Sequence, residues 1–272
     1  CTPLLTNHPN SPLRETVVSL TNHNVVVNWG DEQAKSVLGR VWHRTARIGD
    51  DIYVFAGQER DNANFINHLT RIRIVNSTAE DPDDTTTTDT LEINHIDYQT
   101  DGISCSQVTN LAGHEMVAVN NKLYVFGGVS VHNDEFNILL YVYDPERNTW
   151  TQPQLFGDVP TPREGHSMVH YKSPSNRDLL YVFGGSDNSG LMDNEMYVLD
   201  LETMIFRRVE RSDSDEEYRP TPRYYQSTVL YNDHLYVFGG YLYTRNRRPL
   251  DRLFVFSIEQ DQWVTSIYIP YE

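Results

Sequence analysis

Aromatic and aliphatic residues gather along this chain in short runs that return at regular intervals. The run LYVFGG stands at residues 123–128, 180–185 and 235–240, and a variant, IYVFAG, stands at 52–57. The tyrosines of these runs, at positions 53, 124, 181 and 236, are 71, 57 and 55 residues apart. Four copies at a similar period predict a structure of repeated units, each of which buries its apolar residues against its neighbours.

Each period contains more than the hexapeptide. A short apolar run precedes it, and matching segments follow it at 139–150, 195–206 and 252–263, each with an apolar run, a polar turn and an aromatic residue. Runs of Val, Tyr, Phe and Leu without a helical stripe favour strands. The pattern therefore predicts an all-β chain with four short strands, a to d, in each period, where strand b is the hexapeptide.

The two glycines at the end of strand b have a physical explanation. A residue without a Cβ atom lets the chain turn sharply and lets a neighbouring backbone or large side chain approach closely. The tyrosine and phenylalanine before the glycines alternate between the two faces of the strand, where buried aromatic area is the main stabilising term. We expect each unit to be packed between its neighbours on both faces.

These motifs resemble those of the kelch family of β-propellers. The resemblance rests on the double glycines at 127–128, 184–185 and 239–240, on Trp150 and Trp263, and on the PTPR segments that begin at Pro160 and Pro220. It covers residues 40–270. The family implies blades of four antiparallel strands arranged radially around a channel.

We expect one propeller domain over residues 1–272. The predicted boundaries give a partial blade at 1–39 and four complete blades at 40–98, 99–157, 158–211 and 212–272. The N-terminal segment 16–30 can form an a–b hairpin or c–d strands. It fills an irregular fifth blade, or the ring continues in chain outside this sequence.

Charge and cysteine content limit the binding partners and the cellular compartment that we expect. The formal net charge is −16, which opposes binding to nucleic acid or to an anionic membrane surface. The two cysteines, Cys1 and Cys105, allow at most one disulfide bridge, so the stability of the fold must come from packing. This is usual for proteins of a reducing compartment, and we therefore expect a cytoplasmic location. A first residue other than Met indicates an excised domain or a processed product, and a mature lipoprotein also begins with cysteine.

The candidate motifs for catalysis and metal binding are each incomplete or absent in this sequence. GHEM at 113–116 lacks the second histidine of a zinc helix, and the sequence contains neither a phosphate loop nor a dinucleotide fingerprint. His43, His114 and His166 recur once per blade at the start of strand a, which favours a packing role over a shared metal. We therefore predict no catalytic residue, no metal site and no cofactor. The alternative is a kelch-fold enzyme that acts on a sugar or another small molecule in the channel.

Binding of a protein or peptide is the function that the sequence favours. The b–c and d–a loops emerge on one face, and loops on a rigid scaffold usually carry recognition. Arginines of the segment 241–250 favour an acidic peptide, although a solvated loop explains them equally well. The candidate partner-binding residues are Tyr241, Tyr243, Arg245, Arg247, Arg248, Arg40, Arg163, Arg223, Tyr224, Tyr225, His132 and Asn188. Repetition of Arg40, Arg163 and Arg223 also favours a structural role for these three.

The resemblance implies three kinds of role for the larger protein. They are a substrate receptor of a ubiquitin ligase, a polarity or cytoskeletal scaffold, and a regulator of a GTPase pathway. The sequence does not choose among them, and it leaves the oligomeric state open.

Overall fold

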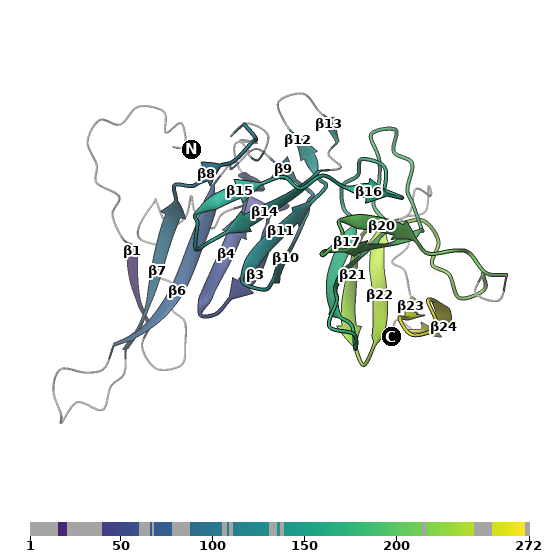
Figure 1. Cartoon of the computed structure of the whole chain (residues 1–272). Coiled ribbons are helices and arrows are strands. Elements are labelled where there is room, and N and C mark those ends of the chain that lie inside the picture. Colours follow the sequence, from purple (N-terminus) through teal and green to yellow (C-terminus); the bar gives the residue numbers. More distant parts are fainter. Residues whose placement is uncertain are drawn as a thin grey trace.

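A computed structural model of the chain consists almost entirely of β-strands and the loops that connect them (Figure 1). It describes residues 16–20, 40–59, 66, 68–77, 88–104, 108, 111–130, 135–136, 139–213, 216–241 and 252–269. The expected all-β fold is confirmed, and the four expected blades are present.

Each blade is an antiparallel sheet whose strands follow the predicted order a, b, c, d. The first blade contains β3 (Arg44–Ile48), β4 (Asp51–Phe55), β6 (Leu69–Ser77) and β7 (Thr88–Ile96). The second contains β10 (Glu115–Val119), β11 (Lys122–Phe126), β14 (Leu140–Asp144) and β15 (Thr149–Thr151). The third contains β17 (Ser167–Lys172), β18 (Asp178–Phe183), β19 (Met196–Asp200) and β20 (Ile205–Arg208). The fourth contains β21 (Tyr224–Tyr231), β22 (His234–Tyr241), β23 (Arg252–Ser257) and β24 (Gln262–Tyr268).

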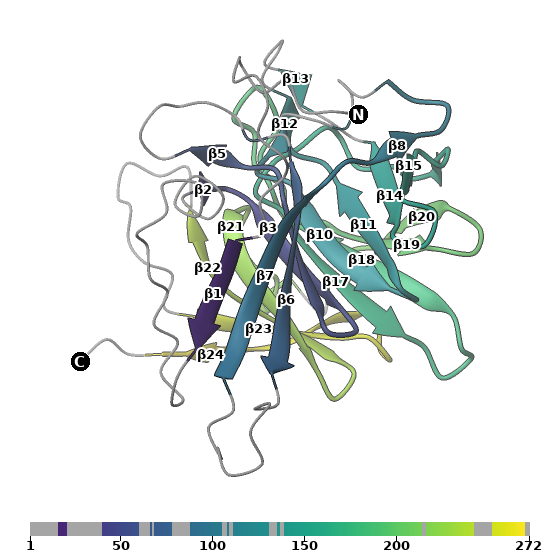
Figure 2. The same cartoon turned by 90° about the vertical axis from the view of Figure 1, so that its left-hand side faces the viewer.

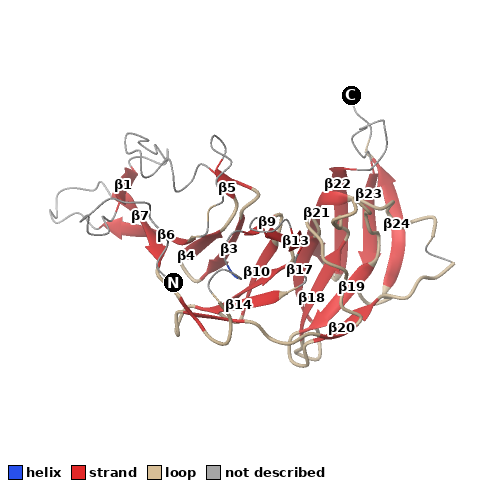
Figure 3. Ribbon diagram, turned by 90° about the horizontal axis from the view of Figure 1, so that it is seen from above, coloured by secondary structure: helices blue, strands red, loops and turns tan. Residues whose placement is uncertain are grey.

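The four blades follow one another along an arc (Figure 3). Their innermost strands, β3, β10, β17 and β21, contact each other in chain order. Strand b of each blade carries the repeated hexapeptide, so all four hexapeptides occupy equivalent places next to the innermost strands.

The connections between blades add strands that the sequence pattern did not predict. After β7, the chain forms β8 (Gln99–Thr100), which pairs in parallel with β15 of the next blade. After β15, it forms β16 (Phe156–Gly157), which pairs in parallel with β20. Each connection therefore ties one blade to the outer edge of the following one.

The N-terminal segment contributes one described strand. β1 (Thr16–Leu20) pairs antiparallel with β7, so it forms the outer edge of the first blade. The rest of the hairpin that we expected at 16–30 lies outside the described residues.

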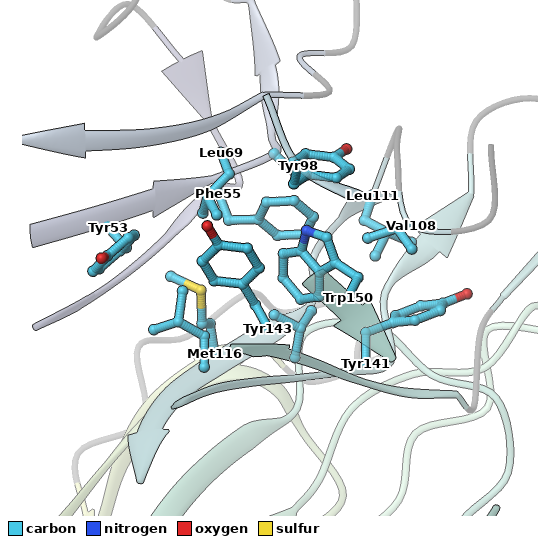
Figure 4. Packing of buried hydrophobic residues seen from close by; sticks show 13 residues of the cluster. Tyr53, Phe55, Leu69, Tyr98, Val108, Leu111, Met116, Tyr141, Tyr143 and Trp150 are labelled. Atoms are coloured by element: carbon cyan, nitrogen blue, oxygen red, sulfur yellow. The ribbon is translucent and has the colours of Figure 1, made fainter. Parts of the chain in front are cut away.

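A separate hydrophobic core fills each of the three interfaces between blades. Between the first and second blades, Trp150 lies among Phe55, Tyr98 and Tyr143, with ring centroids 4.9, 6.0 and 5.1 Å away (Figure 4). The same pairing of a strand-b phenylalanine with a strand-d aromatic of the next blade recurs in the other two cores. The pairs are Phe126 with Phe206 at 5.5 Å and Phe183 with Trp263 at 5.1 Å.

The histidines at the start of strand a complete these interfaces. His114 packs edge-on against Phe55 of the preceding blade, and His166 packs in the same way against Phe126, each with ring centroids 5.5 Å apart. Both rings are buried. They lie in two different interfaces, so they serve packing and do not meet at a shared site.

The first glycine of strand b is required by the neighbouring blade. A Cβ atom on Gly127 would lie 2.6 Å from the His166 ring and 2.9 Å from the Arg163 carbonyl oxygen, both in the third blade. Gly127 also has φ = 68°, a conformation that glycine adopts without strain. At Gly127 and Gly184, close approach between blades is therefore the reason for the glycine, as the sequence predicted, whereas a Cβ atom on Gly239 would meet nothing within 4 Å.

Candidate functional site

One end of the four blades carries the b–c and d–a connections. We call this surface the loop face and define it by residues 40–43, 56–59, 111–114, 127–130, 163–166, 184–195, 220–226 and 239–241. It includes the short strands β2 (Arg40–Val41), β5 (Gln58–Glu59), β9 (Leu111–Ala112) and β12 (Val129–Ser130), and β13 (Glu135–Phe136) pairs with β12 beside it. Figure 2 shows β2, β5, β12 and β13 at one end of the sheets.

Backbone pairing braces each loop at this face. β2 pairs with β5 in the first blade, and β12 pairs with both β9 and β13 in the second. In the third blade, Ser186 forms bridges to Glu164 and Met192, and in the fourth, Tyr224 is opposite Tyr241. The segment before strand a thus holds the segment after strand b in every blade, which preorders the loop face.

A row of backbone hydrogen bonds connects the blades at the centre of this face. The amide of Tyr225 donates to the carbonyl of Gly165 (2.6 Å), that of Gly165 to Gly113 (2.9 Å), and that of Gly113 to Trp42 (3.4 Å). All four residues have positive φ angles, 56° for Trp42 and 55° for Tyr225. We call these four residues the hub.

The hub joins four different blades through residues that occupy the same position in each repeat. Left-handed backbone is costly for aromatic residues, so Trp42 and Tyr225 are held in place by the structure around them.

Three of the predicted site residues meet on the fourth blade. The rings of Tyr224 and Tyr225 have centroids 5.0 Å apart, and those of Tyr224 and Tyr241 are 5.7 Å apart. Tyr241 is 53% exposed, and the other two are partly exposed. We call Tyr224, Tyr225 and Tyr241 the tyrosine cluster. It offers a partner apolar ring area together with phenol groups that form hydrogen bonds.

Glu164 extends the tyrosine cluster toward the third blade. Its carboxylate accepts a hydrogen bond from the Tyr225 hydroxyl at 3.2 Å. Burial raises the pKa of Glu164, and the hydrogen bond from Tyr225 opposes that effect. Burial and the nearby Glu164 charge raise the pKa of Tyr225, so its phenol stays protonated and donates.

The three repeated arginines are buried, and each holds its own blade together. The Nη1 atoms of Arg40, Arg163 and Arg223 donate to the carbonyls of Ala56, Gly184 and Gly239, the first residue of the glycine pair in each blade. Arg163 also pairs with Asp193 at 2.9 Å, and Arg223 lies over the Phe254 ring at 4.6 Å. These contacts support the structural role, and partner binding by these arginines stays a prediction.

The other predicted site residues are spread more widely. Asn188 is exposed in the b–c loop of the third blade, where the neighbouring Asp187 accepts hydrogen bonds from the amides of Ser189 and Leu191. Tyr243, Arg245, Arg247, Arg248 and His132 lie outside the described residues, as do Cys1 and Cys105. Tyr241 directly precedes the arginine-rich segment in the sequence, so the tyrosine cluster lies at its start.

Sequence reasoning missed Glu164 and Trp42. The available signal was the pair of positions that follows the arginine slot, which reads Val-Trp, Ala-Gly, Glu-Gly and Tyr-Tyr in the four repeats. Variation at a repeated position marks a surface adapted to a particular use, and these positions vary as the b–c loops do.

Metal binding and crossing of a membrane are two other functions to consider. Across the described part, no three His, Cys, Asp or Glu side chains converge in a way that could hold a metal ion. Within the same ranges, no helix has the length and apolar character needed to cross a bilayer.

Comparisons with known proteins were made with the whole sequence. The family model described as the KLHDC2/KLHL20/DRC7 Kelch-repeats domain matches residues 113–270. Host cell factor of Drosophila melanogaster is 29% identical over 143 residues, which are 48% of this chain and 9% of that protein.

Two further relatives cover more of the chain. Kelch domain-containing protein 3 of Mus musculus is 26% identical over 165 residues, 58% of this chain and 41% of that protein. Acyl-CoA-binding domain-containing protein 6 of Oryza sativa subsp. japonica is 27% identical over 202 residues, 74% of this chain and 27% of that protein. The chain therefore spans less than half the length of these relatives.

Proposed function

The chain belongs to the kelch-repeat family, and we propose that it is a protein-interaction module that holds a segment of a partner protein across the loop face. Its kelch-repeat relatives point to an interaction module as the general function. The observation that carries the proposal is the tyrosine cluster, which lies partly exposed on loops that backbone pairing already orders.

The existing order of the loops matters because the entropic cost of binding is lower when the loops do not have to be immobilised. The hub bonds and the three cores hold the blades in fixed relative positions, so the loop face presents its side chains from a rigid base. Tyrosine contributes large contact area with few rotatable bonds, which is why it is frequent among the residues that dominate binding energy.

The more specific role that we propose rests on the family resemblance alone. A module of this kind serves a ubiquitin ligase as its substrate receptor, or it holds together a polarity, cytoskeletal or GTPase-pathway assembly. An acidic partner segment suits the arginines that follow Tyr241 in the sequence, and a cytoplasmic setting suits these partners.

Selection from a displayed library of random peptides tests the proposal. We expect the wild-type chain to enrich peptides whose affinity falls about tenfold or more in Tyr241→Ala, because loss of a central tyrosine contact typically costs more than 1 kcal/mol. Isothermal titration calorimetry with the selected peptides measures this change.

Tyr231→Ala is the matched control. Tyr231 ends β21 at the opposite end of the same blade and is 63% exposed, so the variant removes an equally accessible phenol away from the loop face. Peptides that lose affinity in Tyr231→Ala and keep it in Tyr241→Ala would contradict the proposal.

A further inference from the structure

Residues of three other blades border one glycine of the hub. A Cβ atom on Gly113 would lie 2.7 Å from Glu164 Oε2 and 3.5 Å from the Tyr225 hydroxyl. Trp42 contacts the same glycine through the hydrogen bond between its carbonyl and the Gly113 amide. Trp42 of the first blade, Glu164 of the third and Tyr225 of the fourth therefore surround Gly113 of the second. We call this arrangement the hub site.

The hub site contains a carboxylate without a cation. The partly buried Glu115 pairs with Arg44 at 2.7 Å, and Asp193 pairs with Arg163 at 2.9 Å. Among the residues that the structure describes, no basic side chain lies within 4.0 Å of Glu164, whose carboxylate accepts only the Tyr225 hydroxyl. A partly buried carboxylate without a cation gains from one that arrives with a ligand.

Arg44 is a basic group that acts electrostatically on Tyr225, and it is already engaged. Its guanidinium donates to the carbonyl of His43 at 3.1 Å in addition to its ion pair with Glu115. Arg163, next to Glu164 in the sequence, pairs with Asp193, so neither arginine pairs with Glu164. The net charge of −16 adds a long-range attraction for basic segments.

The Tyr225 ring beside Glu164 suits a cation as well. Trp42 is 48% exposed, and Tyr225 is partly exposed. The face of an aromatic ring attracts ammonium and guanidinium groups, most strongly for tryptophan. The two middle blades have glycine at the hub, where a larger residue would collide with Glu164 or with the Tyr225 ring, so the glycines leave room for these two side chains.

We propose that the hub site binds a basic side chain, preferably arginine, of the peptide segment that the loop face holds. The inference rests on the proposed function. Glu164 accepts hydrogen bonds from the guanidinium, while the adjacent Tyr225 provides a ring surface against which its planar group stacks. Arginine is preferred to lysine because its flat, forked group can stack and form paired hydrogen bonds at the same time.

A double-mutant cycle tests this inference with the selected peptides. Each basic peptide is synthesised with arginine and with citrulline, its neutral isostere, and both forms are titrated calorimetrically into wild type and into Glu164→Gln. We expect citrulline to weaken binding to wild type by about tenfold or more, since a hydrogen bond to a charged group contributes about 1.5–3 kcal/mol. We expect Glu164→Gln to weaken only the arginine peptide.

Glu146→Gln is the matched control, because it removes the same charge from an exposed turn between β14 and β15. Both peptide forms should bind it as they bind wild type. Glutamine at position 164 keeps an acceptor for the Tyr225 hydroxyl, and thermal unfolding of each variant checks that the fold is intact.

The outcomes separate the two proposals. If the selected peptides contain no basic residue, or if citrulline and arginine peptides respond equally to Glu164→Gln, the inference about the hub site is overturned. Sensitivity of the same peptides to Tyr241→Ala would leave the proposed function standing. A selection that yields no peptide dependent on Tyr241 overturns both.

Discussion

At equivalent positions of the repeat, residues have different structural roles in different blades. The slot of Arg163 is occupied by a buried arginine in three blades and by the buried Leu111 in the second. The arginine reaches back to the glycine pair of its own blade, whereas the leucine fills the same space as part of a hydrophobic core. The repeat thus needs a buried side chain of suitable size at this slot, and the guanidinium adds hydrogen bonds where the carbonyls are placed to accept them.

The buried arginine leads to a prediction about stability. We expect Arg163→Met to lower the free energy of unfolding by about 3 kcal/mol or more, because it leaves Asp193 and the Gly184 carbonyl without their charged donor. Urea denaturation measures the change.

The control for this variant is Arg207→Met, which removes a surface ion pair with Asp261 and should cost about 1 kcal/mol or less. Equal costs for the two variants would show that the Arg163 network does not stabilise the blade.

The buried histidines lead to a prediction about pH. Burial lowers the pKa of His114 from 6.5 to about 3 and holds that of His166 well below 6.5. Both are neutral in the fold and bind protons when the chain unfolds. Their effect is absent above pH 6.5, and stability falls as the pH drops below it, by about 1.4 kcal/mol per unit for each histidine.

The double variant His114→Gln and His166→Gln should reduce this acid-side slope, since Gln226 already occupies the equivalent position in the fourth blade. Part of the slope should remain, because burial also lowers the pKa of His68 to about 4. Asp178 acts at lower pH, because hydrogen bonds from Lys172, Asn120 and His170, against the effect of burial, lower its pKa from 3.8 to about 2. The difference between wild type and the double variant from neutral pH to about pH 4.5 therefore measures the contribution of these two histidines. An unchanged slope in the double variant would refute their role.

Residue roles were only partly predictable from sequence. Recurrence of Arg163 and His166 at fixed offsets favoured structural roles, because partner contacts have no reason to repeat with the fold, and the buried contacts of both residues support such roles. The hub was not predictable, since the residue types of Trp42 and Tyr225 do not indicate a left-handed backbone conformation. That conformation is imposed by hydrogen bonds between blades far apart in sequence.

At the scale of elements, the blade interface explains why one hexapeptide is written four times. In the first three blades its phenylalanine meets an aromatic residue of strand d in the next blade, and in the second and third blades its first glycine leaves room for His166 or Gln226 at the start of the next strand a. Period and composition were enough to predict strands a to d. β8 and β16 escaped prediction because two-residue strands carry no pattern, and their pairing depends on the position of the following blade.

Equivalent residues on different blades provide a test of this interface. Tyr171 of β17 faces the fourth blade and is 7% exposed, whereas Tyr231, at the matching position of β21, is 63% exposed. We expect Tyr171→Ala to lower the free energy of unfolding by about 3 kcal/mol, as for other buried aromatic residues, and Tyr231→Ala to change it by less than about 0.5 kcal/mol.

Chemical denaturation of both variants makes the comparison. A large loss in Tyr231→Ala would mean that this face of the fourth blade is covered in solution, contrary to the structure.

The whole molecule separates stability from recognition. Apolar residues of the four blades meet in three cores, while the side chains of the tyrosine cluster and the hub site stand at one end of the sheets. This division allows the loop face to vary without loss of the fold. Sequence predicts that the residues of the tyrosine cluster lie on the loop face, because loop positions follow from strand order, but the contact between Glu164 and Tyr225 requires the assembled blades.

Hydrogen–deuterium exchange on the chain, with and without a saturating selected peptide, tests the central claim most directly. We expect the peptide to slow exchange at the loop face, most strongly in residues 163–166, 223–226 and 239–241. Exchange at the opposite turns, such as 120–121 and 232–233, should not change. Protection confined to those turns, or to the outer face of the fourth blade, would contradict the account.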